Sequence, residues 1–502
     1  MKMMVPLYRT SLLFSLLCLV CAADDNNKQS CAYVTQRTQC GHLACNETTS
    51  TCSKCQQDTD CYPSAMYCYQ SEKDSDKSGT CQVKSFFSSD NFSFLTVLAM
   101  IFACLIGAIG VVAGVGGGGM LVPMFCICLS LPMESAVGLS QSTICGQSTL
   151  NMYFAVQQHF QNDQNWKRPL INYQYLSLLL PLGLMGTMIG GQLSKVCPDF
   201  LRLLLLFLLL SVVLYRTVIK MKQQYAEDHE ANKATEVVVT SQPAEEEENE
   251  TNDNNNNEDE EEDDNNDNTN NTNEVSAKDD QEQYPKQELG VNFAAFFIVL
   301  FFNIIRQYTS CGGFWYWCCL LLPLLILGGI FYYAYTHLQQ LTDRQRSFAW
   351  NTNNTVKYPL VAVIAGAAAS MLGIGGGLVL GFVLYEVGLT PEETSATSGM
   401  STFFIAFSAA LQLLVGGKLL VDYGLVFFIV GLCATAVSTF YLKKKIKENG
   451  WNFLIVGALA FIVGGSLVVL GAYGTYNAVV TSRLGGSIVA FGRLCPKSIT
   501  VG

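Results

Sequence analysis

Long apolar runs constrain this chain more than any other feature of its sequence. Ten of them follow residue 91, and each is long enough to cross a hydrocarbon core of about 30 Å as a helix. They occupy residues 92–115, 135–158, 173–195, 199–221, 291–307, 314–335, 358–374, 394–416, 422–442 and 452–474. Two shorter runs, 119–131 and 378–388, follow glycine clusters, and neither can cross alone because 13 residues of helix rise only about 20 Å. The expected fold is therefore an all-α polytopic membrane protein.

The composition agrees with a membrane protein. Of the 502 residues, 50% are hydrophobic and only 14% are charged, whereas a soluble domain is about a quarter charged. The formal charge is −11, but 23 of the 41 carboxylates lie between Glu227 and Glu288. Residues 222–290 are expected to form an acidic, disordered cytoplasmic linker, because this segment has too few apolar residues to bury a core. The composition excludes a soluble enzyme, and the acidic balance argues against nucleic acid as a partner.

The first 23 residues are typical of a secretory signal peptide. Lys2 and Arg9 precede a short apolar run, and Cys21-Ala22-Ala23 supplies small residues at the cleavage site. A first transmembrane helix is the alternative, but the run is short for a complete crossing. We therefore expect residues 1–23 to be removed from the mature chain.

Residues 24–90, called the cysteine-rich module below, are expected to be extracellular or lumenal. The segment is polar and contains eight cysteines: Cys31, Cys40, Cys45, Cys52, Cys55, Cys61, Cys68 and Cys81. Eight thiols behind a signal peptide predict four disulfides in a module too small to bury a core. The Cys52–Cys55 spacing would also suit zinc or a redox motif, but no matching histidine pair or strand–helix pattern accompanies it. The glycosylation sequons at Asn46 and Asn91 are compatible with the same side of the membrane.

The membrane part contains an internal duplication. At a constant offset of 259 residues, Gly114-Val115-Gly116-Gly117-Gly118 matches Gly373-Ile374-Gly375-Gly376-Gly377, Pro132 and Glu134 match Pro391 and Glu393, and Ser142-Thr143 matches Ser401-Thr402. Composition alone would give far fewer identities over such a stretch. We assign the first repeat to residues 92–221 and the second to 357–475, with a central helix pair at 291–336 and a tail at 476–502.

Basic residues in short loops indicate which helix ends face the cytoplasm. Loops assigned to that side contain Lys167, Arg168, Arg216, Lys220, Lys222, Arg344, Arg346, Lys357, Lys443, Lys444, Lys445 and Lys447. These positions agree with one another only if the two repeats are inverted, although Arg483, Arg493 and Lys497 in the tail disagree. The first repeat then begins outside and the second inside, in a plasma membrane or an endomembrane.

The glycine clusters are where we expect the chemistry. Glycine costs a helix about 1 kcal/mol relative to alanine, and a broken helix survives in a membrane only where it lines a cavity or is covered by protein. The short helix after each cluster presents free N–H groups and the positive end of its dipole, which favour an anion. Paired broken helices in two repeats are typical of secondary transporters, whereas close packing through small residues is the alternative reading.

The helix after each glycine cluster adds hydroxyl and amide groups on one face. We expect an anion to contact Gly116, Gly117, Gly118, Ser142, Thr143, Gln147, Gly375, Gly376, Gly377, Ser401 and Thr402. Ordinary hydrogen bonding between helices would explain the hydroxyls equally well. No inward-facing arginine cluster is apparent, and Glu134 and Glu393 are interpreted as helix caps rather than as proton-coupling groups.

These features together resemble the sulfite exporter TauE/SafE family of membrane permeases. The resemblance rests on the duplicated glycine motif, the proline–acid step and the helix with serine and threonine, over residues 92–475. The stretch Cys311-Gly312-Gly313-Phe314-Trp315-Tyr316-Trp317 is similar to one in eukaryotic members. Membership implies transport of sulfite, sulfate or small organosulfonate anions without a nucleotide-binding domain. The cysteine-rich module, the acidic linker and the central helix pair depart from compact bacterial members.

Other chemistry is sparse in this sequence. Its four histidines form no metal or catalytic pattern, and the glycine clusters lack the Lys-Ser/Thr ending of a phosphate-binding loop. We therefore expect that the protein is not an enzyme and that it binds neither a cofactor nor a metal ion. The expected partners are a small anion and the lipid bilayer, while a coupled proton or cation and a homo-oligomer stay open. The alternative function is a membrane receptor or sensor in which the cysteine-rich module binds a ligand.

The predicted topology can be tested by glycosylation mapping. Asn46 and Asn91 should receive glycans, because they face the oxidising compartment, whereas the sequons at Asn249, Asn270 and Asn353 should stay bare. Glycosidase shifts of variants that retain one sequon each would measure this. A glycan on Asn353 would contradict the inverted arrangement.

Overall fold

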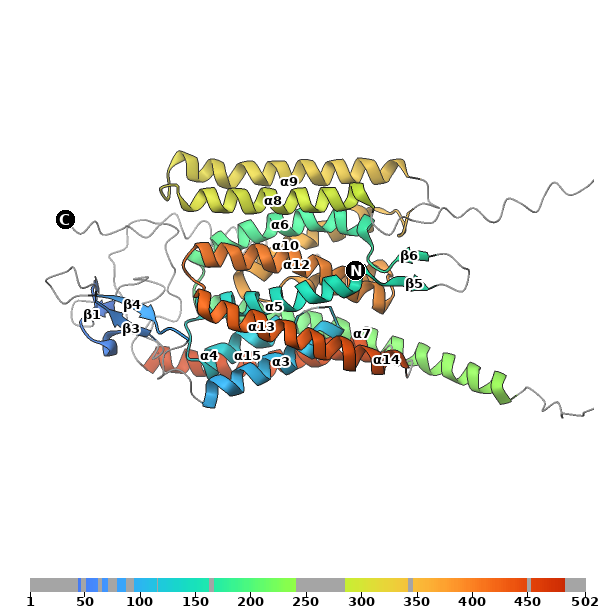
Figure 1. Cartoon of the computed structure of the whole chain (residues 1–502), viewed down its shortest axis with the longest axis horizontal. Helices are drawn as coiled ribbons and strands as arrows, with labels where there is room; N and C mark the ends of the chain where they lie inside the picture. Colours follow the sequence, from blue (N-terminus) through green and yellow to red (C-terminus); the bar gives the residue numbers. More distant parts are fainter. Residues whose placement is uncertain are drawn as a thin grey trace, which may run out of the picture.

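A bundle of long helices, with a small β element at either end, makes up most of the described structure (Figure 1). The computed structural model describes residues 44–46, 51–61, 66–70, 79–86, 94–114, 116–161, 167–240, 285–341, 346–448 and 453–483. The expected signal peptide, Cys31, Cys40, Asn91, residues 241–284 of the linker and the tail after Arg483 lie outside these residues.

Each half of the bundle contributes four long helices and one short helix. The first half consists of α3 (Phe94–Val112), α4 (Gly118–Cys128), α5 (Met133–Val156), α6 (Tyr173–Val196) and α7 (Asp199–Thr240). The second consists of α10 (Tyr358–Leu372), α11 (Gly377–Val387), α12 (Pro391–Val415), α13 (Val421–Val437) and α15 (Phe453–Arg483). A π-helical turn, η3 (Asn353–Lys357), leads into α10, while η4 (Ser438–Lys443) and α14 (Lys444–Glu448) extend α13. Between the halves, α8 (Lys286–Gln307) and α9 (Phe314–Gln340) pack along α6 at one edge of the bundle (Figure 1).

The predicted polytopic all-α fold is confirmed. Within the described residues, nine helices are long and apolar enough to cross a membrane. Helix α5 is not among these nine, although its 24 residues are long enough, because it carries a buried row of polar side chains. Helices α4 and α11 have 11 residues each, so they reach only about 16 Å into the bundle, as the glycine breaks predicted.

Two features differ from the expected boundaries. Helix α7 continues to Thr240 and projects beyond the bundle, past the linker boundary expected at residue 222 (Figure 1). The glutamine, alanine, lysine and glutamate residues that follow the apolar run are good helix formers, so the helix has no local reason to end there. Strands β5 (His159–Gln161) and β6 (Lys167–Pro169) form a hairpin between α5 and α6 that the sequence did not indicate, because three-residue strands leave no readable alternation.

Contacts between the halves define the two ends of the bundle. At the module end, Ser85 lies in the last part of the cysteine-rich module, after β4, and donates a hydrogen bond to Asp422 at the start of α13. At the hairpin end, Asn172 follows β6 and accepts a hydrogen bond from Ser347, which precedes α10. Helix α3 therefore enters from the module end and α10 from the hairpin end. The first helices of the two halves thus run in opposite directions through the bundle. An inverted duplication requires this arrangement, and the duplication itself is our interpretation of the sequence.

Disulfides hold the described part of the cysteine-rich module. Strands β1 (Ala44–Asn46) and β2 (Thr51–Ser53) form one antiparallel pair, and β3 (Met66–Tyr69) and β4 (Thr80–Val83) form the other. Disulfides join Cys55 to Cys68 and Cys61 to Cys81, and Cys45 and Cys52 are also disulfide-bonded. Oxidation of Cys52 and Cys55 removes the thiolates that the zinc alternative needed. Cys311, in the loop between α8 and α9, is disulfide-bonded as well, which the sequence analysis missed.

Thiol labelling under denaturing, non-reducing conditions should separate two classes of cysteine. Cys311 and the bonded cysteines of the module should stay unlabelled, whereas Cys126, Cys145 and Cys319 should react once the bundle unfolds, because these three are free and buried. Peptide mass spectrometry would identify each position. Labelling of Cys311 without a reductant would contradict the assigned oxidation state.

Candidate functional site

The two glycine motifs have the same backbone geometry. Positive φ angles occur at Gly114, Gly116 and Gly117, with values of 72°, 75° and 72°, and at their counterparts Gly373, Gly375 and Gly376, with values of 77°, 75° and 76°. This left-handed conformation is accessible to glycine at little cost, whereas other L-residues are strained there. Each motif therefore ends one helix and starts a short one, α4 or α11, whose first N–H groups have no partner within the helix.

The two motifs meet inside the bundle, around Ile144 of α5. A Cβ atom added to Gly118 would lie 2.6 Å from the carbonyl oxygen of Gly373. Added Cβ atoms at Gly116 and Gly375 would each lie 2.9 Å from Cγ2 of Ile144, which is fully buried. The space expected to hold an anion between the motifs is thus filled by an apolar side chain in this conformation.

Serine side chains link each motif to the opposite half. Oγ of Ser140 on α5 donates to the carbonyl oxygen of Gly373 at 2.8 Å, and Oγ of Ser398 on α12 donates to that of Gly114 at 2.7 Å. These two acceptors occupy equivalent positions in the duplicated motif. Each broken helix end is therefore satisfied by a hydroxyl from the other half, and a buried carbonyl without such a partner would be costly.

The predicted hydroxyl ligands are buried, but their hydrogens are directed elsewhere. Thr143, Ser401 and Thr402 donate to carbonyl oxygens four residues earlier in their own helices, at 2.8, 3.0 and 2.7 Å. Ser142 donates to the carbonyl oxygen of Gly424 and so lies at the contact between α5 and α13. Cγ2 of Thr402 would lie 3.5 Å from a Cβ atom added to Gly375, which places this residue beside the second motif. These hydroxyls would have to rotate before they could donate to an anion.

Gln147 is the predicted site residue that fits a ligand best. Its side chain is 1% exposed and lies one turn after Ile144, with Oε1 only 3.1 Å from the position of an added Cβ at Gly116. Neither its amide nitrogen nor its amide oxygen has a hydrogen-bond partner among the described residues. A buried amide without partners costs roughly 1–3 kcal/mol, so its presence beside the motif needs an explanation.

Gly117 and Gly376 lie on the outer side of the same junction. An added Cβ would lie 2.9 Å from Cγ2 of Ile106 at Gly117 and 3.0 Å from Cγ2 of Ile405 at Gly376. Gly377 is the first residue of α11 and is buried. The structure thus brings Gly116, Gly118, Gly375, Gln147 and Thr402 together around Ile144, and it places Ser142 and Ser401 in helix contacts.

Two basic and two acidic side chains pack together at the module end. Arg202 on α7 is 1% exposed and forms an ion pair with Asp199 at 3.2 Å, and it lies 4.0 Å from Glu134. Lys418, in the loop before α13, pairs with the same Glu134 at 2.9 Å. The sequence did not indicate that Arg202 is buried, because a basic residue at the edge of an apolar run cannot be distinguished from a loop charge without the fold.

The predicted acid caps are in the expected places. Glu134 lies in the first turn of α5 and Glu393 in the first turn of α12, where a carboxylate complements the helix dipole. The backbone N–H of Glu393 also bonds Oγ1 of Thr390, the N-cap of α12. Glu134 has the additional role of joining α5 to Lys418.

Comparisons with known proteins support one family throughout. The family described as sulfite exporter TauE/SafE matches residues 98–245. Sulfite exporter TauE/SafE family protein 3 of Arabidopsis thaliana is 26% identical over 398 residues, covering 77% of this chain and 80% of the relative. Family protein 1 of the same plant is 23% identical over 424 residues, covering 80% of this chain and 89% of the relative. No solved structure gives a significant match. With the nine candidate spans of the described residues, these matches indicate a multi-pass membrane protein that is similar to the sulfite exporter TauE/SafE family.

Proposed function

We propose that this protein is a permease that carries a small oxyanion, such as sulfite, sulfate or an organosulfonate, across the membrane. Its relatives carry the name sulfite exporter, and its polytopic fold is that of a transporter family. The anion binds where the two glycine motifs meet. No nucleotide hydrolysis takes part, so the gradient of the anion or of a coupled ion drives the flux.

The unsatisfied amide of Gln147 is the observation that carries this assignment. An anion that enters a dry site must replace its hydration with hydrogen-bond donors. The Nε2 amide hydrogens of Gln147 and the first N–H groups of α4 and α11 supply such donors without a full positive charge. Neutral donors suit a transporter, because a site that holds its substrate too tightly would not release it.

Ile144 explains how the empty site stays closed. Its side chain packs against both motifs, so the free protein avoids an open polar cavity in the membrane interior. Binding requires Ile144 to move away and Thr143 and Thr402 to rotate from their own helix carbonyls toward the anion. Arg202 and the partly exposed Lys418 lie at the module end, and each forms an ion pair with a carboxylate.

The two halves of the site would then move against each other. Each motif is bonded to the polar helix of the opposite half through Ser140 or Ser398, so neither half contains a complete site. In an inverted duplication, rocking of one half against the other exposes the shared site first to one side and then to the other.

Uptake of labelled sulfite, sulfate and taurine into proteoliposomes tests the function directly. The wild type should carry at least one of them, whereas Gly117→Ala and Gly376→Ala should each reduce uptake at least about tenfold, because the strain of a non-glycine residue at positive φ, about 1–2 kcal/mol, is added to a clash at the motif. Gly388→Ala is the matched control, since Gly388 has a φ of 97° with no atom within 4 Å of an added Cβ. Its uptake should stay near that of the wild type. Absence of flux for all three anions would refute the proposal.

A stability measurement separates a binding role of Gln147 from a packing role. Gln147→Leu should leave the protein as stable or stabilise it by about 1 kcal/mol, because it removes an unsatisfied buried amide, yet it should weaken anion uptake. Gln412→Leu is the control, because Gln412 bonds Asn303 at 3.0 Å and Ser370 at 3.3 Å, and its replacement should lower the melting temperature. Thermal unfolding in detergent would measure both. A destabilised Gln147→Leu protein would show that the amide is structural.

A further inference from the structure

Two tripeptides of the same kind precede the two halves of the bundle. Lys84-Ser85-Phe86 lies before α3, and Arg346-Ser347-Phe348 lies before α10. We call residues 84–86 the module-end strap and residues 346–348 the hairpin-end strap. The sequence comparison missed this match, because the offset between the straps is not that between the glycine motifs.

The module-end strap binds the start of α13. Oγ of Ser85 and the backbone N–H of Phe86 both donate to Oδ2 of Asp422, at 2.7 and 2.6 Å. The Phe86 ring is 2% exposed and lies edge-on to Tyr423, with 5.1 Å between ring centroids. The strap therefore closes over the first turn of α13.

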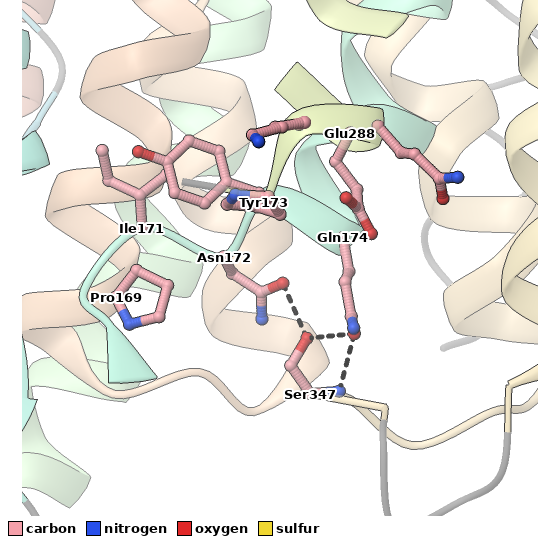
Figure 2. Close-up of a pocket in the computed structure, with 10 residues that line it drawn as sticks. Pro169, Ile171, Asn172, Tyr173, Gln174, Glu288 and Ser347 are labelled. Atoms are coloured by element: carbon pink, nitrogen blue, oxygen red, sulfur yellow. Dashed lines mark hydrogen bonds between the residues drawn. The ribbon is translucent and has the colours of Figure 1, made fainter. Parts of the chain in front are cut away.

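The hairpin-end strap binds the start of α6 in a similar way. Oγ of Ser347 lies 2.8 Å from Oδ1 of Asn172 and 3.0 Å from Oε1 of Gln174, and its backbone N–H donates to the same Gln174 oxygen at 3.0 Å (Figure 2). The Phe348 ring lies edge-on to Tyr175, with 4.9 Å between centroids. Tyr175 lies three residues after the acceptor Asn172, whereas Tyr423 directly follows the acceptor Asp422. In both straps the serine hydroxyl forms the hydrogen bond and the phenylalanine ring packs against a tyrosine.

Each strap connects one half to the other. The module-end strap leads into the first half and binds α13 of the second, whereas the hairpin-end strap leads into the second half and binds α6 of the first. Any motion that separates the halves at one end must therefore break that strap. The opposite strap can stay bound and act as the pivot.

The two straps differ in charge. The module-end strap donates its hydrogen bonds to the charged carboxylate of Asp422. The hairpin-end strap donates its hydrogen bonds to the neutral side-chain amides of Asn172 and Gln174. Hydrogen bonds to a charged group are about twice as strong as neutral ones. The hairpin-end strap is thus the weaker of the two.

A pocket lies beside the weaker strap. Its volume is about 320 Å³, and Asn172, Gln174 and Ser347 line it together with residues at the starts of α6 and α8 (Figure 2). A space of this size would accept a small oxyanion with part of its hydration shell.

We propose that the two straps are the gates of the transport cycle, that they open in turn, and that the hairpin-end gate opens first in the absence of substrate. The inference rests on the proposed function, since it names the closing elements on either side of that site. Breaking both straps at once would separate the halves at both ends, so opening is mutually exclusive.

Accessibility of a reporter thiol between the motifs tests the order of opening. Ile144→Cys serves as the common background in sealed proteoliposomes, and a membrane-impermeant maleimide is added from either side. Labelling of position 144, read by peptide mass spectrometry, should be roughly tenfold faster from the hairpin end. This ratio is expected when the two charge-assisted bonds to Asp422 exceed the three neutral contacts of Ser347 by about one neutral bond.

Variants of each strap should shift labelling in opposite directions. Asp422→Asn, which keeps the shape but removes the charge, should raise labelling from the module end several-fold and lower it from the hairpin end. Ser347→Ala should do the reverse. Ser211→Ala removes a hydroxyl that bonds only within α7, to Phe207, and should change neither rate.

Equal labelling from both ends, or a rise at both ends in Asp422→Asn, would overturn the proposal, because the straps would then be passive supports. The readout needs no transported substrate. If the strap variants shift labelling in opposite directions but no tested anion is taken up, the gates are supported and the proposed substrate is contradicted. If an anion is taken up but labelling is the same from both ends, the substrate is supported and the gates are contradicted.

Discussion

The structure depends on how broken backbone is satisfied inside a membrane. Each glycine motif ends a helix in the bundle interior, where no bulk water can bond the released carbonyl groups. Ser398 bonds Gly114 and Ser140 bonds Gly373, so each half provides the donor that the other half lacks. The breaks that create short helices α4 and α11 are stable only in the assembled pair. This mutual dependence explains why α5 and α12, which carry the donors, are central and more polar than an ordinary membrane helix.

Elements at the edge of the bundle reinforce the same arrangement. Helices α8 and α9 cover α6, where the hydroxyl of Tyr316 on α9 donates to Oε1 of Gln192 on α6. Asn303 on α8 reaches Gln412 on α12 at 3.0 Å. The central helix pair thus connects one helix from each half through buried polar contacts. It also carries Cys311, whose oxidation places the loop between α8 and α9 in the same kind of compartment as the cysteine-rich module.

The candidate site contains an opposition between stability and function. Ile144 fills the junction of the motifs with apolar atoms, and this packing stabilises the bundle. Gln147, one turn away, keeps a buried amide without hydrogen-bond partners, and this amide destabilises the bundle. Natural proteins retain such a cost chiefly where function needs the group. The threonines beside the junction bond their own helices, so the free protein satisfies their hydroxyls until a stronger acceptor arrives.

The sequence by itself determined the spans, the two glycine breaks, the short helices and the disulfide-rich module, because hydropathy, positive-φ preference and cysteine content are local properties of the chain. The duplication also singled out the glycines as the expected site, and helical spacing added Gln147 to it. Only the tertiary structure decided that Ile144 occupies the junction, that Ser142 faces α13, and that Arg202 is buried beside Asp199 and Glu134. The reason is that a side chain's partner depends on the rotation and packing of helices far apart in sequence. Ser140 and Gly373, separated by 233 residues, show this directly.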